Sequence, residues 1–227
     1  DYGRCDLIHE RSAVMVGVID YDAGNVKSVM KAVNKLGGEA VLTADPAILD
    51  TCSSLILPGV GSFGKAMDHL EERGLVSYIR KATGDGRLFL GICLGLQMLF
   101  DRSFEEGERT GLGLIPGEVV RFGKESDPAW NETLKIPHMG WNELVCNRKD
   151  RIGEGVTEGE YAYFVHSYYA RPADWNDVVY YADYSVKVPG VVRRNNVIGM
   201  QFHPEKSSET GMKLLKNFLK EGEHIAG

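Results

Sequence analysis

The segment Leu88-Phe89-Leu90-Gly91-Ile92-Cys93-Leu94-Gly95-Leu96-Gln97 decides the expected fold and its chemistry. A buried apolar run ends at a cysteine between two glycines, and an apolar helical pattern follows. A strand, a sharp turn and a helix in that order are typical of a nucleophile elbow, here with cysteine in place of serine. Glycine is expected at 91 and 95 because side chains there would collide with neighbouring elements. The sequence predicts a nucleophilic Cys93 at a helix N-terminus, which favours a thiolate.

A simpler interpretation of Cys93 is a small buried apolar residue, which is the usual place of a free cysteine. The flanking glycines and the strand–helix junction favour the nucleophile. The other cysteines, Cys5, Cys52 and Cys146, have no such surroundings, and no pair has the C-x-x-C spacing of a zinc ribbon or thioredoxin site. We therefore expect reduced thiols, a cytoplasmic setting and no metal site.

Strand-like and helix-like segments alternate before and through the elbow. Strands are expected at 16–20, 40–43, 54–57 and 87–92, and helices at 26–36, 65–72, 75–82 and 94–100. This alternation predicts a mostly parallel central sheet with helices on both faces. After residue 100 the runs are short and separated by Gly, Pro, Asn and Asp, which predicts antiparallel strands added to the sheet. These runs are 114–122, 133–137, 161–169, 178–184, 190–194 and 197–202.

The chain is expected to fold as one α/β domain over residues 15–227, closed by a helix with Met212, Leu215, Phe218 and Leu219 on one face. Residues 1–14 are interpreted as an N-terminal extension or a remnant of expression, outside the fold. The 26 basic and 32 acidic residues leave a net charge of −6, which argues against nucleic-acid binding. No apolar run approaches the roughly 18 residues of a membrane helix, so no membrane partner is expected.

The best candidate for the base is His203, in Ile198-Gly199-Met200-Gln201-Phe202-His203-Pro204-Glu205. Residues two apart in a strand share a face, so Glu205 is predicted to lie beside His203 and accept its ring N–H. The alternative is a surface histidine beside a solvated glutamate. His166 is a competing base, but no acid stands two residues away, and it is expected to line the site instead.

The loop Leu57-Pro58-Gly59-Val60-Gly61-Ser62-Phe63-Gly64 contains a literal G-x-G-x-x-G. A dinucleotide site is disfavoured because the motif follows the third strand, a proline precedes it, and Asp85 comes before the next strand instead of ending it. We expect the loop to lie beside Cys93 at the carboxyl edge of the sheet. A peptide N–H near Gly59 or Val60 would then join that of Leu94 as oxyanion donor, and a peptide flip there would make the site switchable.

Together, Gly91–Gln97 and Gly199–Glu205 resemble the class I, or triad, glutamine amidotransferases. Further segments narrow the resemblance to the glutaminase subunits of imidazole glycerol phosphate synthase, in histidine biosynthesis. These are Ile19-Asp20-Tyr21 with Gly24-Asn25, the 57–64 loop, Pro137-His138-Met139-Gly140-Trp141-Asn142 and Phe164-Val165-His166-Ser167-Tyr168-Tyr169. The likeness spans Met15 to about Phe218, and the departure at Asp22-Ala23 leaves the chemistry untouched.

The resemblance implies that Cys93 attacks the carboxamide of glutamine, that His203 moves the proton, and that Glu205 orients His203. It implies no cofactor. The oxyanion and substrate contacts that it implies are Gly59, Val60, Gly61, Leu94, Gln97, Ser167 and Tyr168.

The resemblance also implies a partner, because free ammonia is mostly protonated near neutral pH and is then no nucleophile. That partner is a (β/α)8-barrel cyclase subunit in a heterodimer, which uses ammonia to make imidazole glycerol phosphate and aminoimidazole carboxamide ribotide. An aromatic residue and a methionine between Gly and Pro suit an interface core, although a turn packed on its own domain is the alternative. The candidate docking residues are His138, Met139, Gly140, Trp141 and Asn142.

Three other functions stay open at this point. The chain could be a glutaminase for another synthase, such as one for pyridoxal phosphate. It could be a catalytically silent regulatory subunit, which the intact Cys93, His203 and Glu205 argue against. It could also be a cysteine peptidase on a related α/β fold, because the elbow alone does not set the substrate. The resemblance favours a glutaminase that is weak alone and faster with its partner.

Overall fold

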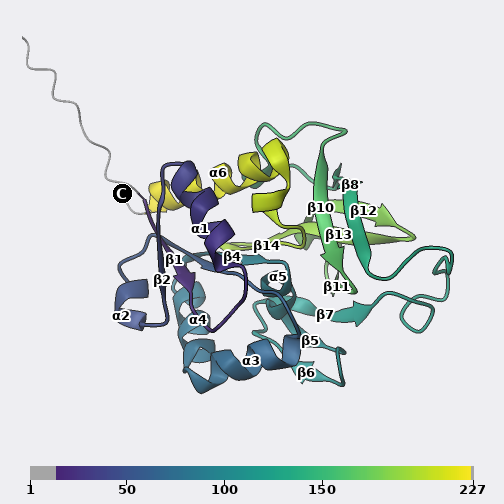
Figure 1. Ribbon diagram of the computed structural model, residues 1–227, viewed down its shortest axis with the longest axis horizontal. Coiled ribbons are helices and arrows are strands. Elements are labelled where there is room, and N and C mark those ends of the chain that lie inside the picture. The colour runs from purple at the N-terminus through teal and green to yellow at the C-terminus, as the bar shows by residue number, and fades with distance from the viewer. Residues whose placement is uncertain (1–13, 226–227) are drawn as a thin grey trace, which may run out of the picture.

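The computed structural model describes residues 14–225, and the predicted extension lies outside this range except for Val14. The backbone carbonyl of Val14 accepts a hydrogen bond from the N–H of Glu39 at 2.8 Å, so the sheet network already includes this residue. An eight-stranded sheet runs through the molecule in the order β2-β1-β3-β4-β14-β13-β12-β9 (Figure 1). Its strands are β2 (Glu39–Thr43), β1 (Met15–Ile19), β3 (Ser54–Leu57), β4 (Leu88–Ile92), β14 (Val197–Met200), β13 (Val186–Arg194), β12 (Val178–Tyr184) and β9 (Val145–Cys146).

The first five strands in that order are parallel, and the other three continue the sheet in antiparallel pairing. The pairing of β14 with β4 sets Met200 opposite Ile92 although 108 residues separate them. This register brings the carboxyl ends of the two strands, and the residues that follow them, to the same edge of the sheet.

Helices cover both faces of this sheet, as the alternating pattern predicts. One face carries α1 (Val26–Lys35) and α6 (Ser208–Ile225), and the other carries α3 (Phe63–Glu72) and α4 (Leu75–Gly84), as Figure 1 shows. The remaining helices are short: α2 (Pro46–Leu49), α5 (Leu94–Met98), and the 3-10 turns η1 (Arg151–Gly153), η2 (Trp175–Asp177) and η3 (Pro204–Lys206). Asp45 and Pro46 fix the start of α2, because Asp45 accepts a hydrogen bond from the N–H of Ala47 and Pro46 occupies the first turn.

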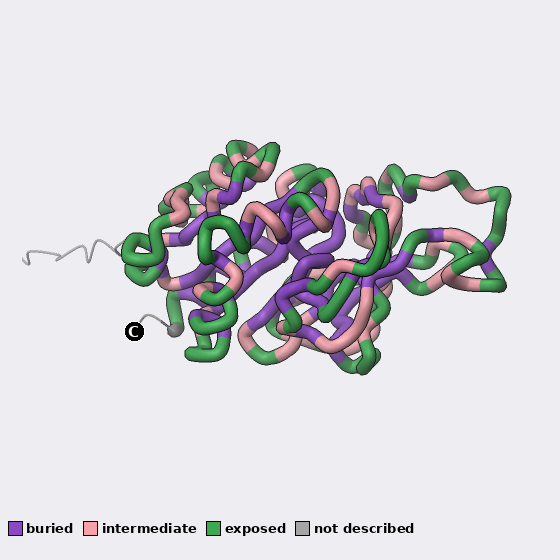
Figure 2. The backbone as a smooth tube through the Cα atoms, turned by 90° about the horizontal axis from the view of Figure 1, so that it is seen from below, coloured by how far each residue is buried: buried purple, intermediate pink, exposed green. Residues whose placement is uncertain are grey.

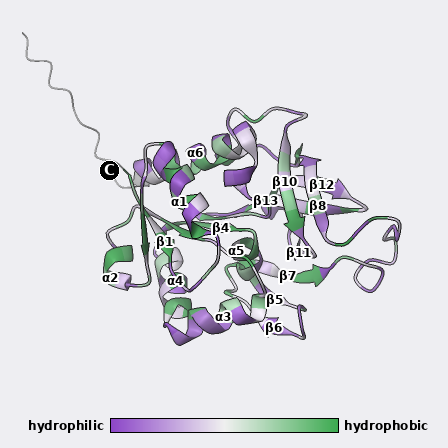
Figure 3. Cartoon of the chain, in the orientation of Figure 1, coloured by the Kyte–Doolittle hydropathy of each residue, from purple (hydrophilic) through white to green (hydrophobic). Residues whose placement is uncertain are grey.

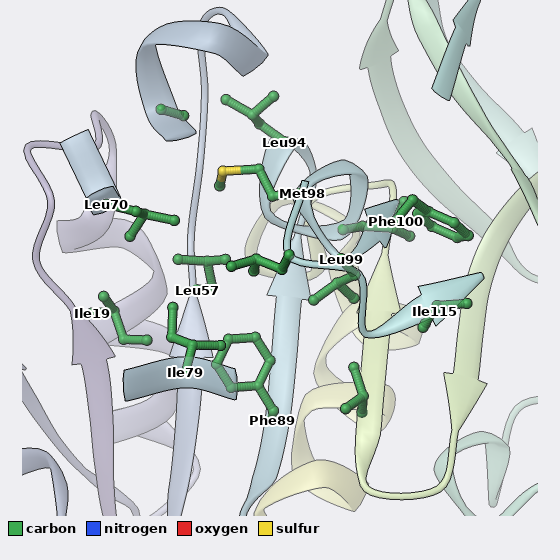
Figure 4. Close-up of a cluster of buried hydrophobic side chains, with 14 of the residues drawn as sticks. Ile19, Leu57, Leu70, Ile79, Phe89, Leu94, Met98, Leu99, Phe100 and Ile115 are labelled. Carbon is green, nitrogen blue, oxygen red and sulfur yellow. The ribbon is translucent and has the colours of Figure 1, made fainter. Parts of the chain in front are cut away.

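The hydrophobic core is divided by the sheet into two layers. In β3, Leu55 and Leu57 pack toward α3 and α4, and Ile56 packs toward α1 and α6. Figure 4 shows the first layer, in which Leu57 and Phe89 meet Leu70, Ile79 and Leu94. Buried stretches of the chain run through the middle of the molecule and the outer loops are exposed (Figure 2), and α3 is largely hydrophilic (Figure 3). The buried layers thus hold the elbow between rigid elements.

The second half of the chain departs from the expected additions to one sheet. A four-stranded sheet has the order β11 (Tyr168–Pro172), β7 (Ile115–Arg121), β5 (Phe100–Ser103) and β6 (Arg109–Thr110). A two-stranded sheet pairs β10 (Tyr161–His166) with β8 (His138–Glu143). The predicted strand 161–169 is therefore two strands of different sheets, and β14 pairs in parallel with β4 on one side and antiparallel with β13 on the other. The sequence pattern predicts the length and burial of a strand, but it does not predict with which other strand it pairs.

Two further boundaries were predicted wrongly. The expected strand at 133–137 is a turn, and the strand begins at His138. The helix expected over 94–100 ends at Met98, because Phe100 starts β5 and pairs with Ile115. The apolar run cannot mark this end, since Met98, Leu99 and Phe100 are all fully buried.

Between residues 14 and 225, no helix combines the length and apolar character needed to cross a membrane.

Candidate active site

Cys93 lies at a sharp turn between β4 and α5. Its backbone has φ 55° and ψ −110°, a left-handed conformation that is unfavourable for a residue with a side chain. Two glycines make the turn possible. A Cβ on Gly91 would lie 2.4 Å from the carbonyl oxygen of Gly95, and one on Gly95 would lie 2.0 Å from that of Leu57. The N–H of Cys93 donates to the carbonyl of Met200 at 2.7 Å, which ties the elbow to β14.

His203 and Glu205 follow β14 at the same edge. The Nδ1 atom of His203 lies 3.0 Å from Oε1 of Glu205, and both side chains are almost completely buried. The expected pair forms, but Glu205 belongs to the 3-10 turn η3 and not to a strand. Ser207 stabilises this turn, because its hydroxyl donates to the carbonyl of His203 at 2.7 Å and accepts from the N–H of Tyr163 at 3.0 Å.

The electrostatic surroundings hold His203 in its protonated form. Burial alone would lower the pKa of the imidazole, but its hydrogen bonds to Cys93 and to Glu205 raise the pKa to about 9. The Oε2 atom of Glu205 is buried without a hydrogen-bond partner in the described part of the chain. A carboxylate whose other oxygen is committed to His203 keeps the imidazole oriented with Nδ1–H toward Glu205, so Nε2 is available for Cys93.

A pocket of about 360 Å³ opens over this group. Its volume suits a single amino acid. Several predicted residues line it together with Glu105 and Val165, which the sequence analysis did not single out, and with His166, which it expected at the site. The predicted residues among the lining are Val60, Gly61, Cys93, Leu94, Gln97, Ser167, Tyr168 and His203.

The backbone N–H of Leu94, the predicted oxyanion donor, is already hydrogen-bonded in this structure. Its N–H donates to the carbonyl oxygen of Gly59 at 3.3 Å, so the carbonyl of the glycine loop stands where a substrate oxyanion would need a donor. Tyr21 holds the preceding peptide, because its buried hydroxyl donates to the carbonyl of Pro58 at 2.5 Å. The loop therefore lies beside Cys93, as expected, but with a peptide orientation that closes the oxyanion site.

The candidate docking segment divides between the two faces of β8. Met139 and Trp141 are more than half exposed, whereas His138 is buried. The His138 ring stacks on Tyr184 at 4.0 Å between centroids, and Asn142 donates from Nδ2 to the carbonyl of Asp183 at 3.0 Å. His138 and Asn142 therefore share the face of β8 opposite to that of Met139 and Trp141. Gly140 lies between them with φ 135°.

Three residues next to the site were missed for different reasons. Glu105 sits in a polar loop without a motif, where it accepts from the N–H of Phe63 at 3.0 Å. Gln201 donates from Nε2 toward Sγ of Cys93 at 3.9 Å, and its position two residues before His203 was an available signal. Tyr21 has no local motif of its own and belongs only to the Ile19-Asp20-Tyr21 segment of the family resemblance.

A larger hollow of about 1250 Å³ lies beside β9, three strands beyond β14 in the sheet. Arg193, which lines it, pairs with Asp150 of the same lining at 3.1 Å and with Glu221 outside it at 2.8 Å. It contains no group that the chemistry at Cys93 requires. Within residues 14–225, no three His, Cys, Asp or Glu side chains are grouped so that they could hold a metal ion.

The comparisons with known proteins agree with this geometry. The family model described as "Glutamine amidotransferase class-I" matches residues 17–221. The chain belongs to the class-I glutamine amidotransferase family. It is 50% identical over 206 residues to the "Imidazole glycerol phosphate synthase subunit HisH" of Geobacillus thermodenitrificans, covering 90% of this chain and 95% of that protein. It is 48% identical to the protein of the same name from Syntrophotalea carbinolica, covering 90% and 98%.

Solved structures share the fold of this glutamine amidotransferase at lower identity. A crystal structure described as a glutamine amidotransferase superposes with a TM-score of 0.70 at 23% identity, covering 92% of this chain and 98% of that one. The structure of PurLQS from Thermotoga maritima gives a TM-score of 0.70 at 22% identity, covering 92% and 99%. These likenesses confirm the α/β fold expected from the sequence.

Proposed function

We propose that this chain is the glutaminase subunit of an imidazole glycerol phosphate synthase in histidine biosynthesis. It hydrolyses glutamine to glutamate and ammonia and passes the ammonia to a cyclase subunit. The observation that carries the proposal is the Cys93–His203–Glu205 group at the base of a pocket of about 360 Å³. Support comes from relatives of that name that are about 50% identical across 90% of the chain.

The proposed reaction begins when His203 takes the thiol proton of Cys93 and the resulting Sγ thiolate attacks the side-chain carbonyl carbon of glutamine. The carbon–nitrogen bond breaks, and ammonia leaves with a proton from Nε2 of His203. Water then attacks the glutamyl thioester while His203 takes a proton from it, and the carbon–sulfur bond breaks to release glutamate. The raised pKa of His203, about 9, keeps the proton for the first step on the imidazole at neutral pH.

The oxyanion formed in both steps needs donors that the present loop orientation does not offer. Rotating the peptide between Gly59 and Val60 removes the carbonyl from Leu94 and turns the N–H of Val60 toward the site. The present loop orientation requires glycine at 59, because a Cβ there would lie 2.6 Å from the Tyr21 hydroxyl oxygen and 3.0 Å from Cβ of Leu94. The resting subunit is accordingly slow, and the rotated loop is the fast form.

The pocket walls supply groups for both ends of the substrate amino acid. The carboxylate of Glu105, half-buried in the lining, suits the α-ammonium group. Gln97 has its amide nitrogen committed to the carbonyl of Tyr168 at 3.0 Å and to Gln201 at 3.2 Å. Backbone groups of Ser167 and Tyr168 contribute polar contacts on the opposite wall.

The partner is expected to be a (β/α)8-barrel cyclase that docks on the outer face of β8 and β10. Met139, Trp141 and Tyr161 are exposed on this face, and the register of the two strands places Val165, a pocket residue, opposite Met139. A partner there would lie next to the site where ammonia forms. We place the complex in the cytoplasm, consistent with free thiols at Cys52, Cys93 and Cys146.

The test is a glutamine-to-glutamate assay on the chain alone and with a cyclase subunit and its ligand. We expect slow hydrolysis alone, faster hydrolysis in the complex, and none after Cys93→Ala. Hydrolysis without any response to the cyclase would favour another synthase as partner. A complex that makes no glutamate would support a silent regulatory subunit, and activity on peptides alone would support a peptidase.

A further inference from the structure

A continuous run of hydrogen bonds joins the docking strand β8 to the candidate pocket. It passes from Asn142 to His138, from His138 to His166, and from His166 to the carbonyl of Tyr168. The distances are 3.3 Å from Nδ2 of Asn142 to Nε2 of His138, 3.1 Å from Nδ1 of His138 to Nε2 of His166, and 2.7 Å from Nδ1 of His166 to the Tyr168 oxygen. These four residues form what we name the histidine relay.

Chemistry allows one arrangement of protons along the histidine relay. The Tyr168 carbonyl can only accept, so Nδ1 of His166 carries a proton and its Nε2 accepts in the neutral ring. Nδ1 of His138 must then donate to that Nε2, which leaves Nε2 of His138 to accept from the Asn142 amide. Every hydrogen points from β8 toward the pocket, and each imidazole is fixed in one tautomer.

Both rings are neutral over the range in which the enzyme works. Burial lowers the pKa of His138 to about 4, and burial together with the neighbouring His138 lowers the pKa of His166 to about 3. A proton added to His166 would set two N–H groups against each other. The relay is therefore a directional contact and not a proton-transfer device at neutral pH.

The histidine relay ends at the Tyr168 carbonyl oxygen, which also accepts a hydrogen bond from a pocket residue. The Tyr168 carbonyl also accepts from Nε2 of Gln97 at 3.0 Å, and that same nitrogen donates to Oε1 of Gln201 at 3.2 Å. Gln201 in turn reaches Sγ of Cys93 at 3.9 Å. The position of the Tyr168 carbonyl thus sets the Gln97 side chain, which lines the pocket next to Cys93.

The relay begins on the inner face of the strand whose outer face is exposed. His138 and Asn142 point inward on β8, and Met139 and Trp141 between them point outward. A displacement of β8 by a docked protein therefore moves the donors of the relay. The His138 ring cannot easily turn to keep its hydrogen bonds when β8 moves, because it is held between Tyr184 and Phe164 at centroid distances of 4.0 and 4.8 Å.

We propose that His138 and His166 are positioning residues that set the Tyr168 carbonyl and the Gln97 side chain for glutamine binding, and so tie the pocket to β8. This inference rests on the proposed function for its kinetic consequences, and neither histidine contacts the reacting atoms. The competing explanation is that the two rings only fill an aromatic cluster with Phe122, Phe164 and Tyr184.

Two substitutions at His138 separate these explanations. His138→Phe keeps the stacked ring and removes the donor, and leaves Nε2 of His166 unsatisfied. His138→Asn loses the ring but places an amide N–H where Nδ1 stood. If the hydrogen bond matters, His138→Phe raises the KM for glutamine about tenfold with kcat within about threefold, and His138→Asn restores most of the KM. If only packing matters, His138→Asn is the more damaged variant.

The experiment measures KM and kcat of the complex with the cyclase for the wild type and both variants, and the tautomers by ¹⁵N NMR of labelled histidine. We expect Nδ1–H at both rings from pH 6 to 8. Nε2–H at either ring, or a His138→Phe KM within twofold of wild type, overturns the inference. If the wild type does not hydrolyse glutamine, the proposed function fails, and the tautomers alone then decide the relay.

Discussion

The N–H of Leu94, a residue that lines the candidate pocket, donates to the carbonyl of Gly59 at 3.3 Å. This bond occupies the donor that an oxyanion next to Cys93 would require. A resting glutaminase with this contact keeps its nucleophile and base assembled but lacks a stabilised transition state. In the proposed mechanism, control of the reaction needs only the rotation of one peptide, with no movement of the triad.

Replacing Cys93 by serine should abolish glutamine hydrolysis, by at least about 10³-fold in kcat, because the hydroxyl is a far weaker nucleophile than a thiolate. The overall fold should be kept, since the side chains are similar in size. Glutamate release in the complex measures the effect. Cys146→Ser is the matched control, because that thiol is exposed and far along the sheet, and it should leave the rate unchanged.

Gly59→Ala should lower kcat about 10²-fold with a small change in KM, because the new Cβ would collide with Tyr21 and Leu94 in the present loop and so displace the peptide proposed to supply the oxyanion donor. Steady-state kinetics with the cyclase present measure it. Gly84→Ala serves as control, since nothing lies within 4 Å of its Cβ position and the helix α4 should gain about 0.5–1 kcal/mol. Equal kcat in wild type and Gly59→Ala would contradict the rotation.

Glu105→Gln should raise the KM for glutamine about tenfold or more, because it removes the charge proposed to bind the α-ammonium group. The amide oxygen can still accept from the N–H of Phe63, so the start of α3 is preserved. The neighbouring Glu106→Gln, on an exposed residue, should leave the KM within about twofold. Similar KM values for both variants would assign another group to the α-ammonium.

The pH dependence of stability should carry the signature of His203. Its folded pKa of about 9 lies above the ordinary value of 6.5, so the stabilisation is fully present below pH 6.5 and is lost as pH rises through 9. The size is on the order of 1–3 kcal/mol. Urea unfolding between pH 6 and 9.5 measures it. Glu205→Gln should reduce the loss, because the pKa of His203 then falls, which an NMR titration of the imidazole reports directly.

Trp141→Ala should leave the free energy of unfolding nearly unchanged, because the side chain is 54% exposed. Binding of the cyclase should weaken by about 2 kcal/mol or more if Trp141 is an anchor of the interface. Titration calorimetry measures the affinity. Ile48→Ser is a control, as an exposed apolar residue on α2 away from β8. Unchanged affinity for Trp141→Ala would move the docking surface elsewhere.

Much of the candidate site follows from local patterns. The elbow is encoded by glycines that the backbone requires at 91 and 95, where any Cβ would overlap a carbonyl oxygen. The pairing of His203 with Glu205 was expected from strand geometry and occurs through the 3-10 turn of Pro204. The prediction of the pair was right although the assumed strand was wrong. Residues two apart come within hydrogen-bond reach both in a strand and in this 3-10 turn.

In the candidate docking segment, local sequence patterns did not predict which way the side chains face. A Pro-bounded stretch with His138, Met139, Trp141 and Asn142 gave no sign of a strand, and so no sign that alternate residues face opposite ways. Once β8 pairs with β10, the twofold alternation exposes Met139 and Trp141 and buries His138 against His166. The histidine relay was invisible in the sequence because its two histidines are 28 residues apart and meet only through this pairing.

The sequence by itself determined the α/β class, the strained turn at Cys93 and the types of group that flank it, since backbone sterics and side-chain periodicity act over a few residues. Only the tertiary structure decided that β14 lies parallel to β4, which brings His203 to Cys93, and that the carbonyl of Gly59 faces Leu94. Strand order and the orientation of a single peptide depend on packing between segments far apart in the chain. Their free energies are sums of many distant contacts that no local pattern records.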